Sequence, residues 1–208
     1  MANLPIYNLS YGVYAVLSDN GEKPSGCIVN TVFQISSEGP TIAVSMNKDN
    51  FTHTLFEKNK KFSVAILSEE TDSNVVSSLG FSSGKDKFKL DGLKYSDKNG
   101  YTILDENCAG HLLCEIVDSL DCNTHTLFIA KVVSSVECEK KNAMTYKYYR
   151  ELRNGGVPKN APTYRETDKT GNYVCDVCGY THTGDINNEP DDFKCPICKV
   201  DKTHFKLK

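Results

Sequence analysis

Short segments rich in β-branched and aromatic residues recur through the first 138 residues, and Gly, Pro, Asn or Asp bounds them. This pattern is typical of β-strands, and residues 11–18 also alternate between apolar and small side chains. Several short strands at this spacing favour a β-barrel or a sandwich. The expected strands are residues 11–18, 27–36, 41–46, 62–67, 111–120 and 125–138.

Helical patterns are fewer, so the fold class is predicted to be mainly β. After about residue 155 the chain is rich in Gly, Pro and charged residues without periodicity, which indicates a connection between domains. We expect a large domain over residues 1–165, a linker over 166–171 and a small module over 172–208. The expected helices are residues 50–61 with Asn50 as N-cap, 71–81 and 143–156.

Composition and charge exclude several classes of function. The net charge is −3 and the Lys and Arg residues are dispersed, so no nucleic-acid or lipid-binding face is indicated. No apolar run approaches the roughly 18 residues of a membrane span. The first residues lack the basic and apolar regions of a secretory signal, so a cytoplasmic location is expected.

The chain has nine Cys residues, and four of them form two C-x-x-C pairs near the C-terminus. The other five are scattered singly, and an odd remainder fits free thiols in a reducing compartment better than disulfides. Buried free thiols are favoured over a catalytic Cys, because Cys behaves as a small hydrophobe. These five are Cys27, Cys108, Cys114, Cys122 and Cys138.

The two pairs, Cys175/Cys178 and Cys195/Cys198, are separated by sixteen residues. Each C-x-x-C turn directs two sulfurs at one ion, so the four together predict a tetrahedral thiolate site. A module this small has too little apolar core to fold without such a staple. Spacing alone leaves a structural zinc ribbon and a redox-active iron equally open.

The residues around these pairs favour iron. Gly179 follows the first pair, where positive φ lets backbone N–H groups point at sulfur and tune a redox site. The phrase "YVCDVCGYTHTGD…FKCPICKVDKTHF" resembles rubredoxin, which implies one iron ion on the four Cys. Lys199 stands where rubredoxins usually have Gly, Phe193 replaces their usual Trp, and the loop between the pairs is short, as in the tail of rubrerythrins. Aromatic residues flank the pairs at Tyr173, Tyr180, Phe193 and Phe205.

The large domain resembles the flavin reductase-like, FMN-binding split barrels. The resemblance follows the order of "PSGCIVNTVFQIS", "GPTIAVSMNKDNFTHTLFEKNKKFSVAIL", "THTLFIAKVV" and "GGVPKNAPTY". It implies a split β-barrel with bound FMN. It also implies roles: Asn30 and Thr31, with Ser36 on the same segment, at the flavin ring; Ser45, Asn47, Thr52 and His53 at the ribityl phosphate end; Lys85 or Lys87 as a cation for the phosphate; and His125 near the flavin.

Each of these residues also has a plainer interpretation. Thr31 and Ser45 fit solvent-facing strand positions, and Asn47 fits a turn. His53 fits a helix cap or surface site, and His125 an ordinary strand end. Lys85 and Lys87 fit solvated surface charges. A phosphate near Thr52 is nevertheless favoured by the free N–H groups at the start of a helix.

The combination of the two domains indicates electron transfer. Flavin can take two electrons from a nicotinamide and release them singly to an iron that accepts one. The resemblance extends to the high-molecular-weight rubredoxins of anaerobes. It implies an NAD(P)H-dependent oxidoreductase, an A-type flavodiiron protein as electron acceptor, which reduces dioxygen or nitric oxide, and a homodimer. The linker would let the module move between flavin and acceptor.

Two alternatives remain open at this stage. The chain could be a flavin or ferric reductase whose Cys module is a structural zinc ribbon. It could also be an electron carrier without a nicotinamide site. The sequence has no G-x-G-x-x-G fingerprint, so it does not establish the donor.

Overall fold

The computed structural model describes residues 5–19, 21, 23–151, 163 and 173–207. Most of its elements are strands, which confirms the mainly β prediction. The predicted linker 166–171 and the end of the predicted helix 143–156 lie outside the described residues. The elements are η1 (Pro5–Asn8), β1 (Tyr14–Asp19), β2 (Pro24–Val29), β3 (Val32–Ser36), β4 (Thr41–Asn47), α1 (Phe51–Asn59), β5 (Lys61–Leu67), α2 (Ser73–Gly80), β6 (Tyr95–Lys98), β7 (Tyr101–Leu104), β8 (Cys108–Cys122), β9 (His125–Glu137), α3 (Tyr146–Glu151), β10 (Tyr173–Cys175), β11 (Thr181–His182), η2 (Ile186–Asn188), η3 (Lys202–His204) and β12 (Phe205–Leu207).

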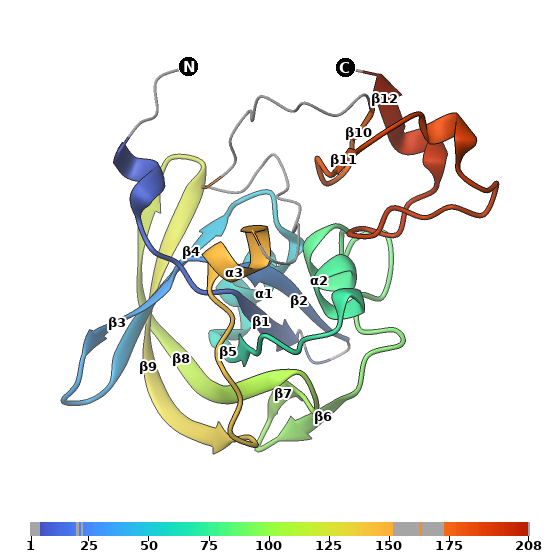
Figure 1. Ribbon diagram of the computed structural model, residues 1–208. Helices are drawn as coiled ribbons and strands as arrows, with labels where there is room; N and C mark the ends of the chain where they lie inside the picture. The colour runs from blue at the N-terminus through green and yellow to red at the C-terminus, as the bar shows by residue number, and fades with distance from the viewer. Residues whose placement is uncertain (1–4, 20, 22, 152–162, 164–172, 208) are drawn as a thin grey trace.

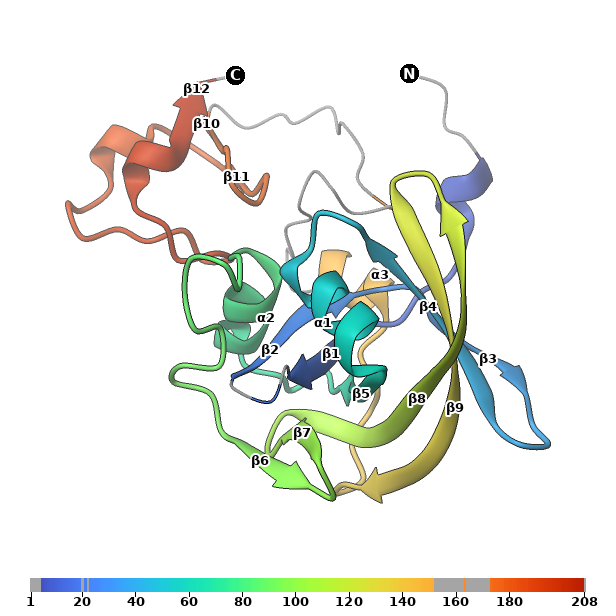
Figure 2. The same ribbon diagram turned by 180° about the vertical axis from the view of Figure 1, so that it is seen from behind.

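One antiparallel sheet forms the large domain, with strand order β2-β1-β5-β8-β9-β4-β3. Its centre is the long hairpin of β8 and β9, which curves across the molecule in Figures 1 and 2. The register of this hairpin shifts between Leu113 and Cys114 and again between Ile116 and Asp118. Irregularities of this kind bend strands and increase their twist, so the sheet curls around a core.

The predicted strand 27–36 is wrong as a single element. It is two strands, because Asn30 and Thr31 leave the ladder between Val29 and Val32. β2 pairs with β1 and β3 pairs with β4, which puts the two halves at opposite ends of the sheet. The side-chain NH2 group of Asn30 donates to the Thr163 hydroxyl at 2.8 Å, and its side-chain oxygen accepts from the Thr31 hydroxyl at 3.1 Å. Side-chain hydrogen bonds therefore hold the chain at the break between the two strands.

The β6–β7 hairpin was not predicted. Its turn, Asn99 and Gly100, has φ values of 56° and 81°. Two successive residues with positive φ match a type I′ turn, for which Asn-Gly is a strong sequence signal. The exposed, polar β6 hid this hairpin, because its four residues lack the apolar pattern of a buried strand.

Helix α1 packs against the inner, concave face of the curled sheet. Phe56 is fully buried, and its ring lies 4.3 Å from that of Phe62 on β5 and 5.3 Å from that of Phe128 on β9. These rings belong to one buried cluster with Val16, Val44 and other strand residues. Burial of large apolar side chains fixes the helix, so the N-terminus of α1 is held at one end of the barrel.

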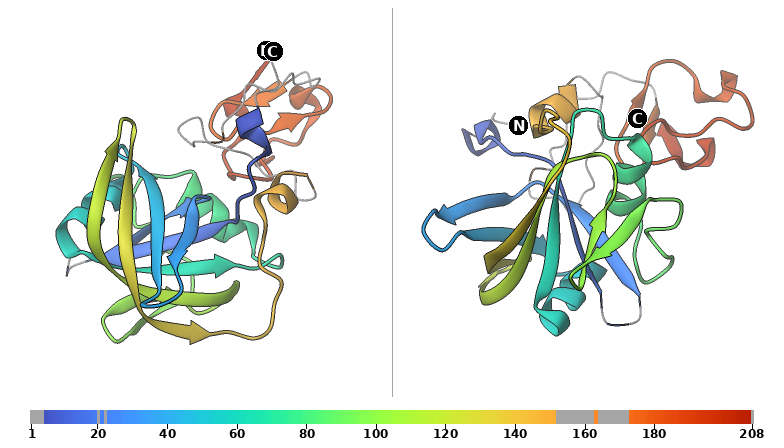
Figure 3. Two further views of the ribbon diagram at one scale, coloured as in Figure 1. Left: turned by 90° about the vertical axis from the view of Figure 1, so that its left-hand side faces the viewer. Right: turned by 90° about the horizontal axis from the view of Figure 1, so that it is seen from below.

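The C-terminal module has its own three-stranded sheet, ordered β11-β10-β12. Ile186 and Phe205 are buried beside the cysteines. The views in Figures 1 to 3 place this module beside α2, with β12 on its far side. Within the described part of the chain, no helix has the length and apolar character needed to cross a membrane.

Candidate functional site

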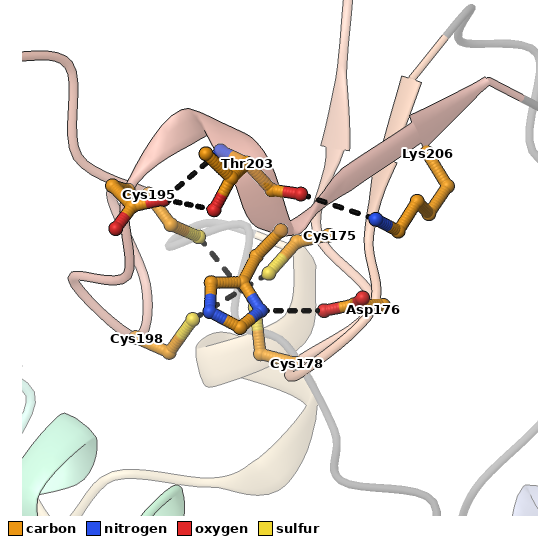
Figure 4. Close-up of polar contacts among 9 residues, drawn as sticks. Cys175, Asp176, Cys178, Cys195, Cys198, Thr203 and Lys206 are labelled. Carbon is orange, nitrogen blue, oxygen red and sulfur yellow. Dashed lines mark hydrogen bonds and ion pairs between the residues drawn. The ribbon is translucent and has the colours of Figure 1, made fainter.

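The four cysteines of the C-terminal module converge on one point (Figure 4). Their sulfurs all lie within 4.8 Å of one another, with Cys175–Cys198 and Cys178–Cys195 separations of 3.6 Å. A disulfide would bring two sulfurs to about 2 Å. A tetrahedral site with metal–sulfur bonds of about 2.3 Å has edges of about 3.8 Å. The donor set therefore fits a single four-thiolate ion, as the sequence predicts.

The four sulfurs of Cys175, Cys178, Cys195 and Cys198 are called the cage below, and two equivalent turns build it. In each turn the residue after the second Cys has positive φ, at 76° for Gly179 and 63° for Lys199. Lys199 thus adopts the conformation that the usual Gly would take, and the second turn keeps the shape of the first. The matching bonds are Gly179 N to Cys175 O (2.9 Å), Lys199 N to Cys195 O (3.0 Å), Cys175 N to Tyr180 O (2.8 Å) and Cys195 N to Val200 O (2.7 Å).

Aromatic rings enclose the cage on its inner side. Phe193, which replaces the usual Trp, lies 5.6 Å from the His182 ring and 5.7 Å from the Phe205 ring, centre to centre. Three of the cysteines are buried, and Cys198 is the more accessible one. On the outside, Asp176 pairs with His204 at 3.0 Å and Lys206 donates to the Thr203 carbonyl at 3.2 Å (Figure 4). The iron site is therefore shielded from water on most sides.

A cavity of about 270 Å³ opens at the N-terminus of α1. It is smaller than the roughly 300–1,000 Å³ pockets that enclose a whole small ligand, so it fits one end of a flavin nucleotide. The lining combines the start of α1, the segment after α2 and one residue of the C-terminal module. The lining residues are Asp49, Asn50, Phe51, Thr52, Gly80, Phe81, Ser82, Ser83, Gly84, Lys89 and Val177.

The chemistry of this cavity suits a phosphate. Asn50 precedes α1 but its side chain does not cap the helix. The His53 N–H donates to the Asn50 carbonyl at 3.0 Å, which leaves the N–H groups of Phe51 and Thr52 to face an acceptor in the cavity. Lys89 is only 4% exposed and donates to the Leu79 carbonyl at 2.6 Å. Among the described residues, no carboxylate forms an ion pair with it. Burial lowers the pKa of Lys89, and an anionic ligand would stabilise its charged form.

The packing beside this cavity is close, and it contains an unpaired polar group. A methyl group added at Gly84 would lie 2.7 Å from the Ser25 hydroxyl and 2.4 Å from the Phe51 ring. Only Gly therefore fits there. The buried Ser25 hydroxyl has no hydrogen-bond partner among the described residues. An orphaned buried hydroxyl is uncommon in native proteins and fits a missing ligand or water.

Lys89 was missed by sequence reasoning, which favoured Lys85 or Lys87. Both of those residues are exposed and neither lines the cavity. All three lie in the run "GKDKFKLDG", and only the neighbours distinguish them. Lys89 has an apolar residue on each side, Phe88 and Leu90, whereas Lys85 does not. These apolar neighbours were the signal in the sequence that Lys89 is buried.

A second group of predicted residues lies on the strands: Thr31 and His125, predicted near the flavin ring, together with Ser45 and Asn47, predicted at the ribityl phosphate end but outside the lining of the cavity at α1. Ser45 N donates to Thr31 O at 3.1 Å, which joins the break after β2 to β4. Asn47 lies opposite His125 in the β4–β9 ladder. Burial lowers the pKa of His125, and its Nε2 has no partner among the described residues. The structure therefore brings Thr31, Ser45, Asn47 and His125 to one region of the sheet.

Two further predicted residues, besides Lys85 and Lys87, lie apart from both groups. Ser36 ends β3, and its hydroxyl donates to the Gly39 carbonyl of the β3–β4 turn at 3.3 Å. His53 is buried, with Nε2 2.8 Å from the Thr126 hydroxyl and its ring 5.2 Å from that of Phe128. Its neighbour Thr52 does line the cavity. The start of α1 therefore offers Thr52 to a ligand and directs His53 into the barrel.

Three thiols of the barrel, Cys27, Cys108 and Cys114, are buried as predicted, whereas Cys138 is half-buried and Cys122 is exposed. Burial raises the pKa of Cys108 and of Cys114 to about 12, and it also raises the pKa of Cys27. Among the described residues, the four C-terminal cysteines form the one cluster with the geometry of a metal site. Cys27, Cys108 and Cys114 are therefore protonated at neutral pH, and they act as small apolar side chains.

Two family models match separate parts of the chain. Residues 6–155 match the flavin reductase-like domain, and residues 173–206 match the rubredoxin-like domain of rubrerythrin. The chain belongs to the flavin reductase-like family. The family resemblance predicted from the sequence, a flavin reductase-like protein with a rubredoxin-like tail, is confirmed.

Relatives of this flavin reductase-like protein include one with both domains. High molecular weight rubredoxin of Moorella thermoacetica is 33% identical over 97% of each chain. The ferric-chelate reductase (NAD(P)H) of Archaeoglobus fulgidus is 32% identical over 77% of this chain and 96% of its own. A solved structure of an FMN-binding protein from Thermus thermophilus has a TM-score of 0.60 at 24% identity, over 67% of this chain and 79% of its own.

These findings support the cofactors that the sequence predicts. The barrel has the fold of FMN-binding flavin reductases, and the four-cysteine module supports one iron ion. The protein is an oxidoreductase of the flavin reductase type. The residue assignments for FMN stay predictions.

Proposed function

We propose that this protein passes electrons from NAD(P)H through FMN in the barrel to iron in the C-terminal cage, and from there to an acceptor protein. The observation that carries the proposal is the pairing, in one chain, of a flavin reductase-like barrel with a four-thiolate cage. The relative with the same two domains is named a rubredoxin of high molecular weight.

Each group has a defined chemical part in this scheme. FMN supplies uptake of two electrons and their release one at a time, and iron supplies a one-electron carrier. Lys89, Thr52 and the N-terminus of α1, which line or open the cavity, would hold the phosphate. The residues around Thr31, Ser45 and His125 border the ring. The paired turns direct the four thiolates at iron and exclude water from it, because three of the sulfurs are buried.

We also propose a homodimer with the flavin near its boundary. The outer face formed by β3, β8 and β9 exposes large apolar side chains, and the register places Leu120 beside Leu127 and Leu127 beside Ser45. Exposed apolar residues gathered on one face mark an interaction site. Those on these strands are Phe33, Ile35, Val117, Leu120 and Val133.

The acceptor is a redox protein, and an A-type flavodiiron protein is the first candidate. The rubredoxin-like module is the part that would contact it, since Cys198 is the most accessible ligand of the cage. Purified candidates can be compared by the rate at which each reoxidises the reduced module.

An absorption spectrum recorded without oxygen, before and after NADH or NADPH, tests the proposal. We expect a flavin band and the red absorption of ferric four-thiolate iron, and we expect both to bleach on addition of the donor. A colourless cage that contains zinc would support a ferric or flavin reductase instead, an activity named in one relative. Flavin that stays oxidised with either donor would indicate an electron carrier without a nicotinamide site.

A further inference from the structure

The cavity at α1 is closed partly by the C-terminal module. Val177 lines this cavity together with Thr52 and Lys89 of the barrel. Phe81, at the C-cap of α2, packs against the buried cluster of the module that contains three of the cysteines. Two apolar residues that are far apart in the sequence therefore join the two domains at the flavin cavity.

The position of Val177 in the sequence gives this contact its significance. Val177 lies between Cys175 and Cys178 and directly precedes the latter. A residue in the wall of the flavin cavity is therefore adjacent to one ligand of the cage, Cys178, and two residues from another, Cys175. In the proposed scheme this cavity takes the phosphate end of the flavin, and the ring lies near Thr31, Ser45 and His125. The rate of electron transfer falls steeply with distance, so seating the module at one end of the same cofactor shortens the path from the ring to the cage.

We propose that Phe81 and Val177 form a docking contact that seats the first cysteine turn on the rim of the flavin cavity, so that the cage receives electrons in place. This inference rests on the proposed function, and it replaces a module that must swing to collect electrons. The transfer that it serves moves one electron from reduced flavin to ferric iron, which becomes ferrous with all four thiolates still bound.

Substitution of Val177 by Glu tests the contact without requiring activity. Full-length chains carrying zinc in the cage and saturating FMN are compared by hydrogen–deuterium exchange. Val177→Glu should speed hydrogen–deuterium exchange in residues 80–84 by about tenfold. This factor corresponds to loss of the free energy gained by burying one valine side chain. Leu207→Glu is the matched control, because Leu207 is 70% exposed on β12 at the far side of the module. It should leave exchange in this segment unchanged.

Rapid mixing of the iron-loaded chains with NADH tests the role in transfer. Iron reduction per bound flavin should slow at least about tenfold in Val177→Glu, less in Val177→Ala, and not at all in Leu207→Glu. An intact red band in each variant shows that the cage has formed. The docking contact is overturned by equal exchange and equal iron reduction in Val177→Glu and the unaltered chain. Faster exchange with an unchanged rate overturns its role in transfer. Flavin that NADH never reduces contradicts the proposed function instead, while the exchange result still decides the contact.

Discussion

Lys89→Met gives a sharp test of the flavin site, because methionine keeps the apolar stem of the side chain and removes the charge. Lys89 is almost fully buried at the cavity and has the Leu79 carbonyl as its hydrogen-bond acceptor. A hydrogen bond from a charged donor contributes about 1.5–3 kcal/mol. Loss of such a bond to the phosphate should weaken FMN binding about 10- to 150-fold.

The same substitution should act in the opposite direction on the ligand-free protein. Burial holds the pKa of Lys89 below its ordinary value, so the unfolded chain binds more protons than the folded chain between the two pKa values. The stability of the ligand-free chain therefore rises with pH through the folded pKa of Lys89. Lys89→Met should remove this rise, as melting temperatures of the ligand-free chain measured across this pH range would show.

Fluorescence titration of FMN and of riboflavin with ligand-free protein measures the effect. Riboflavin lacks the phosphate, so its affinity should be equal in Lys89→Met and the unaltered chain. Lys85→Met and Lys87→Met are matched controls, since both residues are exposed and lie outside the cavity lining. Unchanged FMN affinity in Lys89→Met, with a loss in either control, would refute the placement of the phosphate at this cavity.

Three further predictions concern the cage and the outer face. Cys178→Ser should abolish the red absorption of iron while NADH still reduces the flavin, as absorption spectra of the two bands would show. Lys199→Gly should slow loss of iron to a chelator, because it relieves about 1 kcal/mol of left-handed backbone strain, whereas Gly179→Ala should speed it; equal rates for both would contradict the equivalence of the turns. Leu120→Glu with Phe33→Glu should convert a dimer to monomers in analytical ultracentrifugation, and an unaltered chain that is already monomeric would exclude the proposed interface.

The ligands of the cage could be predicted from sequence because their positions are local. Each C-x-x-C turn is built from consecutive residues, so spacing alone specifies the direction of two sulfurs. The conformation of Lys199 was also foreseeable, since it occupies the place of a Gly in an otherwise matching motif. The mainly β class followed in the same way from short apolar segments.

The flavin site could be predicted only in part, because it depends on pairing between distant segments. Strand periodicity does not reveal that residues 27–36 divide at Asn30, since both halves are apolar. It also does not distinguish Lys89 from Lys87, because burial is set by the packing of this segment against α2. Hydrogen bonding of His53 to Thr126 on β9 is likewise a long-range contact that local sequence does not specify.

The buried thiols of the barrel have a consequence for how the protein acquires its metal. Coordination requires deprotonated sulfur, and the raised pKa of Cys108 and of Cys114 makes this unfavourable in the folded barrel at neutral pH. Once the barrel has folded, its buried thiols no longer compete for incoming iron with the four-cysteine cage of the tail. Folding of the barrel before metal delivery would thus protect the chain from mismetallation during biosynthesis.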